Sequence, residues 1–166
     1  MRRKLANAKQ VLPSNAARAL SGQDSHVTGT NVLDGLDWKI AGIRLEGVPH
    51  TLFQLVNHMI YWQEWGIKWL DGLRPKSPKH ATGSWPGKEA PHSRGEWESA
   101  VRRFRKALQG LQQRSRQENL LSQRGKYTRL EMLHLIASHN SYHIGQAALL
   151  RQQMRAWPPP SGAVTW

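Results

Sequence analysis

Three stretches of the chain open with the S/T-x-x-E/Q pattern that caps the first turn of an α-helix. They are Thr51 with Gln54, Ser93 with Glu96, and Thr128 with Glu131. In this pattern the hydroxyl accepts the backbone N–H three residues later, and the Glu or Gln side chain accepts the N–H of the capping residue. Each pair therefore predicts the start of a helix.

Apolar residues follow these starts at the three- and four-residue steps of an amphipathic helix. After the second start the stripe consists of Trp97, Val101, Phe104, Leu108 and Leu111. Such a stripe is typical of a helix that packs in a bundle. We therefore expect three long helices, over about residues 51–72, 94–122 and 129–156.

The fourth helix of a bundle is expected between residues 25 and 40. Gly29 and Gly35 lie inside that stretch and weaken the helix by about 1 kcal/mol each relative to Ala. Residues 1–24 carry several Arg and Lys and a single Asp. We expect them to form either a frayed basic arm or an extra short helix.

Prolines and glycines crowd residues 73–92, which predicts a long crossover loop between the first two long helices. Loops of that length are uncommon unless they cover a site. The expected fold is therefore an all-α, up-and-down four-helix bundle with a long crossover loop. Its domain should span residues 25–160, with a short tail at 161–166.

The composition excludes some classes of site. The chain has no cysteine, so it has no disulfide, no thiolate metal ligand and no catalytic thiol of its own. No apolar run approaches the ~18 to 20 residues that span a bilayer, and no signal segment opens the chain, so we expect a cytoplasmic protein without a membrane span. The net charge of +13 favours polyanions, membrane surfaces or a small acidic substrate without choosing among them.

Three histidines are expected to point into the bundle. His139 and His143 are four residues apart on one predicted helix, so their side chains lie on one face, one turn apart. His58 lies on another helix, with Leu55 and Trp62 one turn to either side. Three inward imidazoles match the ligand count of catalytic zinc sites, in which a fourth position stays open for water or substrate.

The spacing alone leaves an alternative open, because paired histidines also hydrogen-bond each other, a carbonyl group or a water molecule. The inward position of His58 favours the metal site. For the histidines near loops, caps or the opposite helix face, we expect ordinary surface roles: His26, His50, His80, His92 and His134. Of these, only His50 is also a candidate for the mouth of the site. Further residues are expected to support a ligand or line the pocket, with Gln146 as a hydrogen-bond partner of a ligand, His50 at the mouth, and Arg151, Tyr142 and Trp62 nearby.

The last predicted helix carries a recognisable string. Residues 139–146 are HNSYHIGQ, and they are followed by Leu149-Leu150-Arg151 and by Trp157-Pro158-Pro159. This pattern resembles the last helix of the DinB/YfiT-like family of metal-binding four-helix bundles. The stretch from Pro49-His50-Thr51 to His58 resembles the family's second helix, which supplies its single ligating histidine. Trp85-Pro86 and Trp97 also resemble the family's pattern, so the resemblance spans about residues 25–159.

The resemblance implies a bundle with a long crossover, often dimeric, in which three histidines hold a divalent metal such as zinc or nickel. His58, His139 and His143 fill those positions. Characterised relatives include S-transferases that use bacillithiol, mycothiol or glutathione, and a thiol-dependent maleylpyruvate isomerase. The weak first helix and the basic segment ahead of it depart from the family's pattern, which affects the rim of the site and the dimer surface.

Three functions follow as hypotheses. The first is a metal-dependent hydrolase or low-molecular-weight-thiol S-transferase acting on a small, anionic or thiol-bearing substrate, as a homodimer. The second is a non-catalytic bundle in which a metal or a histidine cluster only holds helices together. The third is a nucleic-acid-binding module built on Arg102, Arg103, Arg105 and Lys106. We expect those residues to form a solvated face instead, because no helix-turn-helix, zinc-finger or RNA-recognition motif accompanies them.

Overall fold

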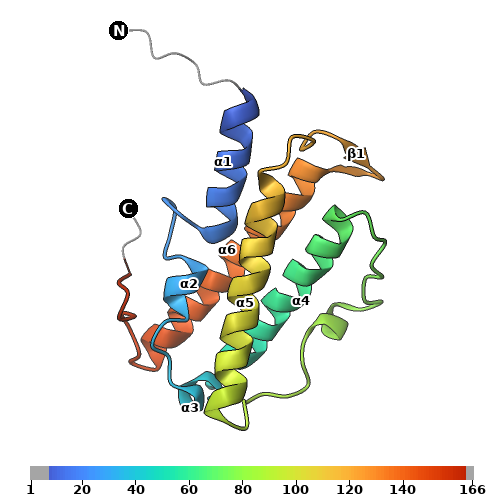
Figure 1. Cartoon of the computed structure of the whole chain (residues 1–166). Coiled ribbons are helices and arrows are strands. Elements are labelled where there is room, and N and C mark those ends of the chain that lie inside the picture. Colours follow the sequence, from blue (N-terminus) through green and yellow to red (C-terminus); the bar gives the residue numbers. More distant parts are fainter. Residues whose placement is uncertain (1–7, 164–166) are drawn as a thin grey trace, which may run out of the picture.

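The computed structural model describes residues 8–163 and confirms an all-α protein (Figure 1). Four long helices form the bundle: α1 (Ala8–Ser21), α4 (Leu52–Leu70), α5 (Arg94–Ser115) and α6 (Arg129–Gln153). The connections carry two four-residue helices, a 3₁₀ turn and a small hairpin: α2 (Gly29–Val32), α3 (Trp38–Ala41), η1 (Ala81–Ser84), β1 (Gln123–Arg124) and β2 (Tyr127–Thr128). Within this part of the chain no helix is both long and apolar enough to cross a membrane.

The crossover loop makes α4 and α5 run in the same direction. Two ion pairs join them, from Arg103 to Glu64 and from Arg114 to Asp71. The paired residues advance together along both helices, as parallel helices require. The loop, which includes η1, returns the chain to the end of the bundle where α4 begins (Figure 1).

Helix α6 runs antiparallel to α4 because the chain turns through the hairpin before α6 begins. Arg129, the first residue of α6, is buried, and its guanidinium donates to the Leu70 carbonyl at the end of α4 and to the Gln117 side chain. This turn also ends α5 at Ser115, whereas the sequence predicted that the helix continues to residue 122. The start of α6 is therefore tied to the end of α4.

Two of the three predicted capping boxes are complete, at Thr51 and Thr128. At the third, the Ser93 hydroxyl accepts the Glu96 N–H, whereas the Glu96 carboxylate accepts the N–H of His92 rather than that of Ser93. Helices α4, α5 and α6 begin within one residue of the predicted starts. Local hydrogen bonding is sufficient to place these starts.

The fourth bundle helix lies elsewhere than predicted. The prediction of a helix over residues 25–40 is wrong, because the structure has only the short α2 and α3 there. They are separated by Gly35, which has a φ of +62°. The fourth helix is α1, inside the stretch 1–24 that the sequence described as an arm or a short helix. It packs between α5 and α6, buries Leu20 and accepts a hydrogen bond from Gln112 at the Ala17 carbonyl. Residues 1–7 lie outside the described part.

The core lies between the four long helices and is mostly aliphatic, with the aromatic side chains Phe53, Trp97 and Phe104 buried in it. Its fully buried side chains include Leu20, Val56, Met59, Phe104, Leu111, Leu133 and Ile144. Where α4 crosses α6, a Cβ atom on Gly66 would lie 2.2 Å from Ile136 Cδ1. The absence of a side chain at Gly66 therefore lets the two helices approach closely, two turns beyond His58.

Candidate metal centre

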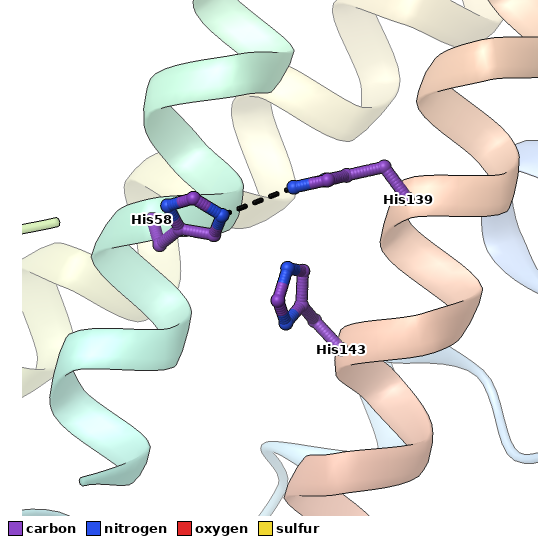
Figure 2. A group of neighbouring side chains, drawn as sticks. All are labelled: His58, His139 and His143. Carbon is purple, nitrogen blue, oxygen red and sulfur yellow. Dashed lines mark hydrogen bonds between the residues drawn. The ribbon is translucent and has the colours of Figure 1, made fainter. Parts of the chain in front are cut away.

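The three histidines predicted as ligands face one another between α4 and α6 (Figure 2). His58 Nε2 lies 3.1 Å from His139 Nε2. The ring of His143 is centred 4.8 Å from that of His58 and 4.5 Å from that of His139. One nitrogen from each ring can be chosen so that all three lie within 4.8 Å of one another. The arrangement is compatible with metal binding.

The position of the cluster follows from helix geometry. His139 and His143 are one turn apart on the face of α6 that packs against α4, and His58 projects toward them from α4 (Figure 2). His58 and His143 are each 5% exposed, and His139 is half-buried. Water is thus kept from most of each ring, while His139 marks the side on which the cluster approaches the surface.

Two of the rings are oriented by hydrogen bonds on the nitrogen that points away from the cluster. His58 Nδ1 donates to the Ser84 carbonyl at 3.2 Å, and His143 Nδ1 donates to Gln146 Oε1 at 2.7 Å. A carbonyl oxygen only accepts, so each Nδ1 carries the proton. The Nε2 lone pairs of His58 and His143 are then available to a cation, as is usual for metal-bound imidazoles.

His139 supplies a test of whether a cation fits. With a lone pair on His58 Nε2, the short approach of His139 Nε2 requires a proton between the two nitrogens. That proton leaves His139 Nδ1 as an acceptor, and this atom is buried and without a hydrogen-bond partner among the described residues. A divalent ion would take the place of that proton and accept the Nε2 lone pair of each ring, so the donor set of three neutral imidazoles fits the ion.

Burial keeps the cluster neutral. It is the largest cause that lowers the pKa of His58 to about 4 and of His139 to about 3, and it also lowers the pKa of His143. The neighbouring imidazoles lower the pKa values of His58 and His139 further, because two positive charges this close repel. At neutral pH all three are in the uncharged form that binds metals.

The crossover loop contributes a residue that the sequence reasoning left out of the site. Trp85 stacks on His58, with ring centroids 3.8 Å apart, and on His50 through its other face at 3.5 Å. Its edge also meets the ring of His143 at 5.6 Å. His50 is therefore separated from the cluster by Trp85. The signal for Trp85 in the sequence was its place in a loop too long to serve only as a connection.

Two of the predicted pocket residues lie against the cluster. Tyr142 packs edge-on against His143 and is 65% exposed, and Trp62 packs edge-on against His139. Both lie beside the cluster, where they could contact a small molecule that approaches His139.

Arg151 does not contact the cluster, which corrects the prediction that it lines the pocket. It is 2% exposed. Its guanidinium donates to the carbonyl oxygens of Val32, Asp34 and Ala156. These bonds tie the end of α6 to α2 and to the segment after α6. Arg151 is therefore part of the packing, a role that its sequence position alone does not reveal.

A family model described as the DinB family matches residues 33–162, a span that holds all three histidines. A comparison with curated proteins found no match, and neither did a comparison with solved structures.

Proposed function

This chain belongs to the DinB family, and from that premise and its histidine cluster we propose that it is a metal-dependent enzyme with one open coordination position. The single observation that carries the proposal is the convergence of His58, His139 and His143. Structural zinc sites are usually closed by four protein ligands, whereas catalytic sites use three and leave a position for water or substrate. Three neutral imidazoles fit zinc or nickel.

The reaction we propose is a hydrolysis or the transfer of a low-molecular-weight thiol. When bound, a divalent cation supplies a Lewis acid that lowers the pKa of a water or thiol brought to it. The chain has no cysteine, so a thiol that takes part in the reaction comes from solution. Within the site, Ser84 and Gln146 hold the imidazole orientations, Trp85 covers one side, and Trp62 and Tyr142 border the approach to His139.

The net charge of +13 suits an anionic substrate or a thiol cofactor with carboxylates. The homodimer expected from the family resemblance stays a prediction, which light scattering after size exclusion checks. The nucleic-acid role stays the less favoured alternative. Arg102, Arg103 and Arg105 each form an ion pair with an acidic side chain of this chain, as residues of a solvated face do.

The proposal is tested by measuring metal content and activity on the same preparations. Wild-type protein should hold about one zinc or nickel ion per chain by elemental analysis. With that metal it should consume electrophiles in the presence of bacillithiol, mycothiol or glutathione, or hydrolyse members of an ester and amide panel. His143→Ala should lose both properties. His134→Ala, on the exposed face of the same helix, is the matched control and should keep them. Activity that survives in His143→Ala would exclude the proposed site.

A non-catalytic metal site is the second candidate, because the three ligands bridge α4 and α6 and a metal there would join two long helices. In that case chelation lowers the unfolding temperature, while thiols leave the visible spectrum of the Co²⁺-substituted protein unchanged. A spectral shift on addition of thiol would favour the enzyme, because it requires an exchangeable position on the ion.

A further inference from the structure

His58 is oriented by a short segment of the crossover loop, residues 84–89, which we call the strap. The Ser84 carbonyl accepts the His58 Nδ1–H, and the Trp85 ring stacks on the His58 imidazole with an angle of 4° between the planes. The other face of Trp85 rests on His50. The strap thus determines both the direction of the His58 ring and the nitrogen that carries its proton.

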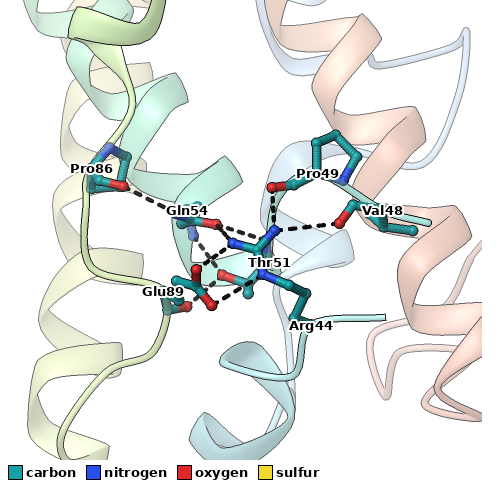
Figure 3. A network of polar contacts seen from close by, with 7 residues as sticks. All are labelled: Arg44, Val48, Pro49, Thr51, Gln54, Pro86 and Glu89. Carbon is teal, nitrogen blue, oxygen red and sulfur yellow. Dashed lines mark hydrogen bonds and ion pairs between the residues drawn. The ribbon is translucent and has the colours of Figure 1, made fainter. Parts of the chain in front are cut away.

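The far end of the strap is held by a two-bond ion pair (Figure 3). Arg44 Nε and Nη2 donate to the two carboxylate oxygens of Glu89, at 3.1 and 2.5 Å. Nη1 of the same guanidinium donates to the Pro49 carbonyl at 2.5 Å and to the Val48 carbonyl at 3.4 Å. Arg44 therefore joins the strap to the segment that leads into α4.

Two residues at the start of α4 add neutral bonds to the strap (Figure 3). Thr51 Oγ1 donates to the Glu89 carbonyl, and Gln54 Nε2 donates to the Pro86 carbonyl at 3.1 Å. Gln54 Oε1 also accepts the Thr51 N–H, which completes the capping box of α4. His58 lies one turn after Gln54 on the same helix. The strap and the helix that bears His58 are thus bound together from Pro86 to Glu89.

We propose that Arg44 and Glu89 are positioning residues for the metal ligand His58, an inference that rests on the proposed function. Their ion pair holds the strap in place, so that the Ser84 carbonyl keeps the His58 proton on Nδ1 and leaves Nε2 to the metal. Neither residue touches the cluster. Both side chains are exposed, at 39% and 52%, and exposed ion pairs add little to global stability. A loss of metal affinity without a loss of stability would therefore identify positioning.

The chain offers a matched control in the ion pair of Arg114 with Asp71. It has the same two-bond geometry, with distances of 2.7 and 2.5 Å, and it also involves an end of α4. It lies at the opposite end of that helix from the strap. Breaking it removes an equivalent surface contact without reaching Ser84 or Trp85.

The test compares Arg44→Gln and Glu89→Gln with Arg114→Gln and Asp71→Asn. Zinc dissociation constants are measured by competition with a chromogenic chelator, and stability by urea unfolding of metal-free protein. We expect the two strap variants to bind zinc about tenfold more weakly, at the lower end of the effect of residues that support metal ligands. The two control variants should stay within about twofold of wild type by the same measure.

A second readout is independent of the metal. Long-range ¹H–¹⁵N spectra of metal-free protein report which nitrogen of His58 carries the proton. Wild type should show the Nδ1–H form, and Arg44→Gln should show a mixture of both forms. The inference is overturned if the strap variants keep the wild-type zinc affinity and the pure Nδ1–H form. It is also overturned if the control variants lose as much zinc affinity as the strap variants. If wild type itself binds no zinc, the proposed function fails, and the His58 proton position alone decides the role of Arg44 and Glu89.

Discussion

Acidification of the metal-free protein should destabilise it because its site histidines are held neutral. In the folded chain the pKa is about 4 for His58 and about 3 for His139, whereas the ordinary value of about 6.5 applies after unfolding. Between these values the unfolded chain binds more protons than the folded chain, so stability rises with pH. The stability that depends on keeping His58 and His139 neutral is fully present above pH 6.5 and is lost as the pH falls toward 4.

The size of the effect follows from the two pKa differences. Each histidine that is protonated only after unfolding costs about 1.4 kcal/mol per pH unit once the pH is below 6.5. From pH 7 to pH 5 this amounts to about 2 kcal/mol for each ring, or about 3 to 4 kcal/mol for His58 and His139 together. Domains have total stabilities of about 5 to 15 kcal/mol, so the change is a large share of the whole.

The assay is urea unfolding of chelator-treated protein at pH 7, 6 and 5, followed by circular dichroism. His50 and His143 also have lowered pKa values, and therefore the double variant His58→Gln/His139→Gln is needed to isolate the two rings. It should lose about 3 to 4 kcal/mol less than wild type over the same range. Equal pH dependence in wild type and double variant, or no pH dependence in wild type, would refute the claim that burial keeps these rings neutral.

Two further predictions concern the support of the site. Gln146→Leu removes the acceptor for His143 Nδ1–H and should raise the zinc dissociation constant about 10- to 100-fold in chelator competition; an unchanged constant would contradict this support. Gly66→Ala places a methyl group against Ile136 and should cost about 1 to 3 kcal/mol in urea unfolding, despite a gain in helix propensity of about 1 kcal/mol. Ile136→Val in the same chain should recover part of that loss, and a more stable Gly66→Ala protein would show that the helices can separate there.

The sequence by itself determined the features that depend on neighbours within one or two helical turns. The starts of α4 and α6 follow from capping boxes at Thr51 and Thr128, whose bonds span three residues. The inward direction of His58, His139 and His143 follows from helical period, because the same face carries the apolar residues that must be buried. The all-α class and the convergence of the three rings were predictable for this reason.

Other features depended on contacts between segments far apart in the chain. The identity of the fourth helix was decided by packing, since α1 contains Pro13 and has a weak local signal but fits between α5 and α6. The sequence does not show whether Arg151 is exposed or buried. Its hydrogen bonds to the carbonyl groups of Val32, Asp34 and Ala156 show that it is part of the packing.

The tertiary structure also decided the environment of the three clustered histidines. Residue spacing does not show that the Ser84 carbonyl and the Trp85 ring reach His58 from a loop about 26 residues further along the chain. Nor does it show how far the pKa values of His58 and His139 fall, because that depends on how much water the folded chain excludes. Local patterns identify the three histidines, and long-range packing sets their orientation, charge and neighbours.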